Sequence, residues 1–163
     1  MRGLLMRWSE RFAAFGGAAL LGAVAVTLVS VLGSALFGKP LLGDTEIVEI
    51  LVGIAVACFM PYCQMRGANV IVDFFTARAS PRLRDALDAA AFAVFTVIVA
   101  VLTERMIEGA FTQYERERVS MFLRIPQWWG YAAASVAGVL WVAVCAWTAW
   151  ERLAAFVSGR KAA

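Results

Sequence analysis

The chain has 163 residues, of which 62% are hydrophobic and 17% are charged, and its formal net charge is +3. A soluble domain carries about 25% charged residues, and a domain this short cannot bury so much apolar surface away from water. The composition therefore excludes an ordinary soluble protein and predicts one all-α membrane domain covering residues 1–163. Because no basic run exceeds two residues, we expect no nucleic-acid partner.

The absence of histidine excludes several classes of enzyme and redox protein. Paired histidines cannot hold a haem here, and zinc hydrolases and Ser-His-Asp hydrolases would lack a required ligand or base. The three cysteines, Cys58, Cys63 and Cys145, lie in apolar runs and lack the spacing of metal ligands. We therefore expect no catalytic residues, no cofactor, no metal site and no enzymatic activity.

The first predicted membrane helix covers residues 12–38, an uncharged run that is long enough to cross a hydrocarbon core of about 30 Å. Its arginine-rich start and the segment around Ala25 are similar to a cleavable signal peptide, but the apolar run continues to Gly38. We therefore expect an uncleaved helix. Small residues that recur at multiples of four predict close packing of this helix in lipid, within the chain or against another subunit. They are Gly22, Ser30, Ser34 and Gly38.

The second predicted helix covers residues 46–66 and begins with two carboxylates, Glu46 and Glu49. A charge at the middle of a membrane costs about 2.5–3.5 kcal/mol, and neither glutamate lies at that depth. This position argues against a proton relay or an ion site. We expect a polar contact at the helix mouth, either with Arg105 or with a partner protein.

A short amphipathic helix is predicted for residues 67–79, between the second and third membrane spans. Val70, Phe74 and Ala77 share one apolar stripe, and Pro81 follows the end of the segment. A helix of this kind suits the membrane interface.

The third predicted helix covers residues 84–106 and has a helical extension to about residue 118, because apolar residues continue at a spacing of four beyond the span. Arg105 and Glu108 can form an ion pair on its surface.

The fourth predicted helix covers residues 125–151, with aromatic residues at both ends, as is typical of the membrane–water interface. Gly130, Ala134 and Gly138 recur every four residues, which predicts close packing within the chain or against another subunit. The aromatic residues expected to anchor the chain at the interface are Trp128, Trp129, Tyr131, Trp147 and Trp150.

Lysine and arginine positions predict the orientation. Ten basic residues fall in the two termini and in the segment between the second and third helices. The five that fall on the other side are Lys39, Arg105, Arg116, Arg118 and Arg124. The positive-inside rule then places both termini in the cytoplasm.

Three stretches resemble a known family. Residues 43–49 (GDTEIVE) open the second helix, Pro61 is followed by residues 66–73 (RGANVIVD), and Ser120 precedes residues 125–131 (IPQWWGY). Their order and spacing resemble the small membrane subunit, DctQ type, of tripartite ATP-independent periplasmic (TRAP) transporters over about residues 12–154. Within RGANVIVD the chain has asparagine where the family commonly has histidine, so it lacks a titratable group there.

The resemblance implies a multi-pass scaffold subunit in the bacterial inner membrane. Such a subunit would brace the large TRAP permease subunit and help to dock the periplasmic substrate-binding protein during sodium-coupled import of organic acids, such as C4-dicarboxylates or sialic acid-like carboxylates. Sodium is expected in the large subunit, and membrane lipids are the remaining expected partner.

The alternative is a free-standing small carrier that acts as an oligomer. For the scaffold reading, twelve residues are candidates for the partner interface: Glu46, Glu49, Arg66, Asn69, Asp73, Arg105, Glu108, Ser120, Pro126, Gly130, Ala134 and Gly138.

Overall fold

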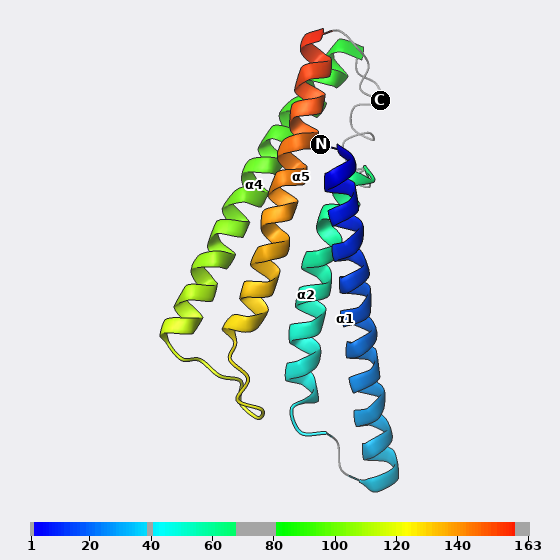
Figure 1. Cartoon of the computed structure of the whole chain (residues 1–163), viewed down its shortest axis with the longest axis vertical. Coiled ribbons are helices and arrows are strands. Elements are labelled where there is room, and N and C mark those ends of the chain that lie inside the picture. The colour runs from blue at the N-terminus through cyan, green and yellow to red at the C-terminus, as the bar shows by residue number, and fades with distance from the viewer. Residues whose placement is uncertain (1, 39–40, 68–80, 159–163) are drawn as a thin grey trace.

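A computed structural model describes residues 2–38, 41–67 and 81–158, and the regular structure in these ranges is helical (Figure 1). The helices are α1 (Arg2–Phe37), α2 (Asp44–Met65), α4 (Pro81–Glu115) and α5 (Trp128–Ser158). Each contains a stretch long and apolar enough to cross a membrane, which confirms the predicted four spans. The amphipathic helix predicted for residues 67–79 falls outside the described residues apart from Gly67.

Helices α1 and α5 extend well beyond the predicted spans. α1 begins at Arg2, ten residues before the predicted start at residue 12, and α5 continues to Ser158 instead of residue 151. The predicted bounds follow the uncharged runs, which mark the part of each helix that suits the hydrocarbon core. The helix itself continues into charged residues, because its backbone hydrogen bonds also form in water. With 36 residues, α1 is about 54 Å long and exceeds a hydrocarbon core of about 30 Å.

The extension of the third span is helical as predicted but ends earlier, at Glu115. The chain turns there because Glu117 adopts a left-handed backbone conformation, with φ of 47°. Its N–H donates to the Tyr114 carbonyl at 3.1 Å, which closes the last turn of α4.

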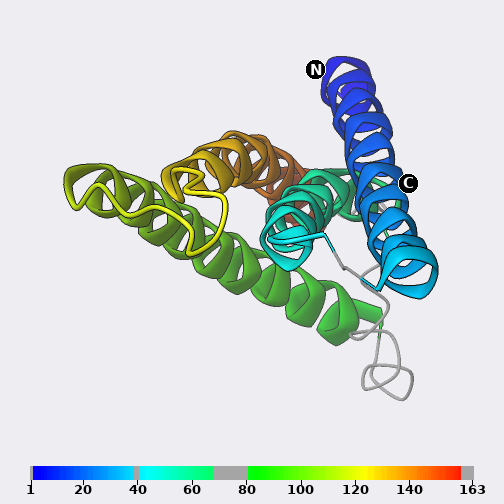
Figure 2. The same cartoon turned by 90° about the horizontal axis from the view of Figure 1, so that it is seen from below.

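The four helices lie in an open row. Among the described residues, α1 packs on α2, α2 packs on α5, and α5 packs on α4, while α4 contacts neither α1 nor α2 (Figures 1 and 2). Successive helices run in opposite directions, so that the start of α1 and the end of α5 lie on the same side of the molecule, at the top of Figure 1. The two ends of the row, as used below, are the top and the bottom of this view. Two peripheral helices therefore keep most of their apolar surface exposed.

Small residues bring α1 against α2. The buried residues of α1 are Ser9, Gly16, Ala23 and Ser30, which recur every seven residues. A Cβ atom on Gly16 would lie 3.0 Å from the carbonyl oxygen of Ala55. A repeat of seven residues keeps one face of a helix against a supercoiled neighbour. Small residues on that face allow the two helices to approach closely in lipid.

The predicted packing stripe on this helix lies only partly within the contact between α1 and α2. Of its four members only Ser30 is buried. Ser34 is exposed, and Gly38 follows the end of the helix with φ of 65°. A spacing of four drifts around the helix, because 3.6 residues make one turn.

The small residues of α5 pack against two different helices. A Cβ atom on Gly138 would lie 3.0 Å from Thr103 Oγ1 in α4, and one on Gly130 would lie 3.7 Å from Ile50 in α2. Ala134, between them, is buried. These contacts support the first of the two predicted uses of this stripe, which is packing within the chain.

Side-chain hydrogen bonds link neighbouring helices near both ends of α2. Ser30 Oγ in α1 donates to Asp44 Oδ2 at the start of α2 at 2.5 Å. Gln64 Nε2, near the other end of α2, donates to Thr148 Oγ1 in α5 at 3.2 Å. In an apolar surrounding a polar side chain needs a hydrogen-bond partner from a neighbouring helix. These bonds therefore hold α2 between α1 at one end and α5 at the other.

Candidate functional site

The carboxylate of Glu46, in the first turn of α2, holds the connection between α4 and α5. Ser120 Oγ donates to its Oε2 at 2.6 Å, the Phe122 N–H donates to Oε1 at 2.8 Å, and the Leu123 N–H donates to Oε2 at 3.0 Å. Hydrogen bonds to an ionised acceptor are shorter and stronger than neutral ones. The sequence predicts Glu46 and Ser120 as site residues separately, and the structure brings them together.

The loop that wraps around Glu46 is also closed on itself. Val119 and Pro126 form an isolated antiparallel bridge. Inside it, the Ser120 N–H donates to the Ile125 carbonyl at 2.9 Å, and the Ile125 N–H donates to Ser120 Oγ at 3.2 Å. The Ser120 hydroxyl therefore accepts one bond from its own loop while it donates another to α2.

Gly43 provides the second contact between this loop and α2. Its φ is 83°, and a Cβ atom built on it would lie 2.6 Å from Cγ of Leu123. The position therefore needs glycine for two reasons, the left-handed backbone and the close approach of the leucine. With the Ser30–Asp44 bond, the connections α1–α2 and α4–α5 meet at the start of α2.

This arrangement holds an apolar loop tip in an exposed position. Met121 is 89% exposed and Phe122 is 62% exposed, although the backbone amide of Phe122 is bound to Glu46. Exposed apolar side chains on an ordered loop are suited to contact with lipid or with another protein.

The contact predicted between Glu49 and Arg105 does not form. Glu49 is exposed, and among the described residues it has no hydrogen bond or ion pair. Arg105 instead pairs with Glu108 at 2.8 Å, as the sequence predicts from their spacing. The reason for the first result is topological, because α5 lies between α2 and α4. Both members of the pair are exposed, so that it contributes little to stability.

The other candidate interface residues divide between the two ends of the row. Arg66, at the far end of α2, donates from Nε to the hydroxyl of Tyr62 at 3.0 Å and lies over its ring. Asn69 and Asp73 lie outside the described residues. Pro126 belongs to the loop held by Glu46.

The aromatic residues predicted as interfacial anchors are not alike. Trp129, Tyr131 and Trp150 are exposed. Trp128 is half-buried and packs edge-to-face on Tyr114, with 5.7 Å between the ring centroids. Trp147 is also half-buried, and its indole N–H is buried without a hydrogen-bond partner among the described residues.

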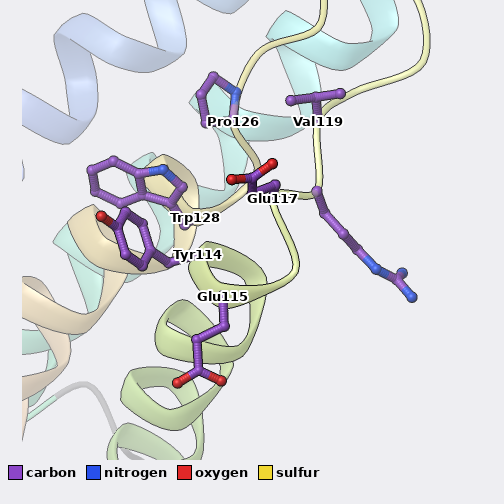
Figure 3. A pocket seen from close by; sticks show the side chains of 7 residues that line it. Tyr114, Glu115, Glu117, Val119, Pro126 and Trp128 are labelled. Atoms are coloured by element: carbon purple, nitrogen blue, oxygen red, sulfur yellow. The ribbon is translucent and has the colours of Figure 1, made fainter.

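Two hollows share Tyr114 and Trp128 in their linings, where α4 ends and α5 begins. One, of about 370 Å³, has a partly polar lining of loop residues that includes Glu117 (Figure 3). The other, of about 350 Å³, is an apolar groove between the two helices. Sequence reasoning missed both hollows, since it treated the segment up to residue 118 only as a helical extension and Trp128 only as an anchor.

Comparison with known proteins gives one finding. The family model described as "Tripartite ATP-independent periplasmic transporters, DctQ component" matches residues 23–155. No curated protein and no solved structure matches the chain. The matched range includes both Glu46 and the whole loop that it holds.

Proposed function

The chain belongs to the DctQ family and is a small component of a TRAP transporter, and from this premise we propose that it is a scaffold that braces the large permease subunit. The complex would import organic acids by coupling to a sodium gradient, with the substrate and sodium sites in the large subunit. We also propose that it lies in the bacterial inner membrane with both termini in the cytoplasm, because the basic residues concentrate at that end.

The open row of helices is the observation that supports a bracing role. Only four residues of α1 are buried within the chain, and large apolar side chains cover the rest of its length within the membrane. Leu21, Val24 and Leu28 are all more than half exposed. The two peripheral helices of the row present wide apolar faces. Another membrane protein can pack against such a face through van der Waals contacts.

The loop held by Glu46 supports a role in docking the periplasmic binding protein. On the proposed orientation this loop faces the periplasm, and it exposes Met121 and Phe122 beside Arg124. A loop fixed in advance loses less conformational entropy on binding than a free one. The loop would therefore act as a preformed contact surface.

The direct test is coexpression of the chain with the large permease subunit, followed by affinity purification and reconstitution into proteoliposomes. We expect the two proteins to copurify, and we expect uptake driven by a sodium gradient only when both subunits and the binding protein are present. Substrate-dependent sodium flux by this chain alone would contradict the scaffold proposal and favour the free-standing oligomeric carrier.

A pair of matched variants locates the bracing surface. One replaces Val24 and Leu28 of α1 with tryptophan, and the other replaces Val97 and Val101 of α4, all of which are exposed. We expect one variant to lose copurification and the other to retain it. Unchanged recovery of both would contradict bracing through either peripheral helix.

A further inference from the structure

The two hollows beside Tyr114 and Trp128 have complementary linings and share these two aromatic residues. We propose that together they bind one phospholipid whose headgroup carries an ammonium group, as in phosphatidylethanolamine. An acyl chain would lie in the apolar groove and the ammonium in the polar hollow. The proposal does not depend on the role of the chain in transport.

The groove between α4 and α5 has the properties of an acyl-chain site. Small residues at Ala110 in α4 and Ala132 in α5 leave space between the helices, and Phe111 lies along the same lining. Ser135 is the one polar side chain there apart from the Tyr114 and Trp128 rings, and its Oγ donates to the Tyr131 carbonyl at 2.7 Å. With that hydroxyl bonded internally, the groove suits a hydrocarbon.

The polar hollow has the properties of an ammonium site. In Figure 3 the carboxylate of Glu117 points toward the ring of Trp128, whereas Glu115 points away from it. The Tyr114 and Trp128 rings pack edge to face, with 88° between their planes, and both rings line the hollow. A cation is attracted both by a carboxylate and by an aromatic face, and the attraction increases when water is excluded.

The end of α4 fixes Glu117 in this position. Its left-handed backbone turns the chain back over the helix, and the Arg118 N–H donates to the Gln113 carbonyl at 3.3 Å. The carboxylate therefore comes from the closing turn of α4, directly beside the start of α5, and does not depend on a free loop.

The charges around the hollow favour a zwitterionic headgroup over an anionic one. Its lining contains two carboxylates, Glu115 and Glu117, and one guanidinium, from Arg118. The lining residues therefore carry a net charge of −1, and an ammonium can pair with the carboxylate of Glu117, which points toward Trp128. An anionic headgroup without an ammonium would meet an excess of negative charge. Tryptophan and tyrosine also prefer the headgroup depth, which sets the site at the level of the membrane surface.

Native mass spectrometry of the purified full chain tests the proposal, with phosphatidylethanolamine and phosphatidylglycerol of the same acyl composition added in turn. We expect phosphatidylethanolamine to be retained roughly three- to tenfold more strongly. Glu117→Gln should reduce this preference to about equal retention, while Glu104→Gln, at an exposed position elsewhere on α4, should preserve it.

A groove-filling substitution separates the acyl site from the headgroup site. Ala110→Phe should lower the retention of both lipids about equally, whereas Ala35→Phe, on the exposed surface of α1, should lower neither. Ala132→Phe fills the groove from the opposite helix and replaces the first variant if that variant loses its helical circular dichroism.

Three outcomes would overturn the proposal. The first is equal retention of the two lipids by the unaltered chain. The second is equal lipid retention by the groove-filling and Ala35→Phe variants. The third is a complex with the large permease subunit that lacks this lipid and is broken by Glu117→Gln, because the hollow would then receive a cationic side chain of that protein.

Discussion

The Glu46 carboxylate and the Ser120 hydroxyl, 74 residues apart in the chain, lie 2.6 Å apart and join the start of α2 to the loop between α4 and α5. The bond matters for the architecture because, among the described residues, α2 and α4 make no contact. It ties the α1–α2 pair to the α4–α5 connection at one end of the row. Near the other end of α2, the bond between Gln64 and Thr148 joins this helix directly to α5.

We predict that Glu46→Gln loosens the loop without unfolding the helices. The substitution keeps the size of the side chain but replaces an ionised acceptor with a neutral one, which accepts weaker hydrogen bonds. Deuterium exchange of the Phe122 and Leu123 amides should become roughly three- to tenfold faster. Glu49→Gln is the control, since Glu49 is exposed one turn further along α2. Equal exchange in the two variants would contradict the role of Glu46.

We predict that Gly43→Ala destabilises the protein for two separable reasons. The left-handed backbone should cost about 1 kcal/mol, and the contact with Leu123 should add about 1–3 kcal/mol. Gly38→Ala reports the first cost alone, because its φ is 65° and a Cβ atom there would have open space.

Unfolding in mixed detergent micelles measures both effects. The double variant Gly43→Ala/Leu123→Ala should lose most of the excess cost and approach Gly38→Ala. If Gly43→Ala is no more destabilising than Gly38→Ala, the contact with Leu123 has no energetic consequence.

We predict that Gly16→Leu separates α1 from α2 and that its neighbour Gly17→Leu does not. A Cβ atom on Gly16 would lie 3.0 Å from the Ala55 carbonyl oxygen, which is backbone and cannot move aside, whereas one on Gly17 would have open space. Overpacking of this kind costs about 1–3 kcal/mol. Cross-linking between cysteines placed at Ala23 and Leu51 should fall in the first variant. Unchanged cross-linking in both variants would show that the small-residue repeat does not set this interface.

We predict that the two ends of the helical row lie on opposite sides of the membrane, with the termini in the cytoplasm. Single cysteines at Gly3 and Arg116, both exposed, should be introduced into a background without the three native cysteines. An impermeant maleimide added to intact spheroplasts should label only the cysteine at residue 116. Labelling of both positions from outside would contradict the four-span topology, and labelling of residue 3 alone would reverse the orientation.

The sequence by itself determined the membrane-spanning helices and the family. A hydrocarbon core requires about 20 apolar residues per span and leaves helices as the simplest way to satisfy the backbone, so that four long apolar runs predict four helices. The Arg105–Glu108 pair was predictable for a similar reason, since residues three apart on a helix are neighbours whatever else the chain does. Order and spacing of short motifs indicated the DctQ family, which the family match confirms.

Only the tertiary structure decided which helices touch and which side chains meet. In lipid, a buried face and an exposed face are equally apolar, so that hydrophobic pattern does not reveal that α5 separates α2 from α4. That order excludes the predicted contact between Glu49 and Arg105. Likewise, Glu46 meets Ser120, and Tyr114 meets Trp128, because separate segments converge at one end of the row. Contacts of this kind depend on the path of the whole chain, and neither residue's immediate neighbours carry a signal for them.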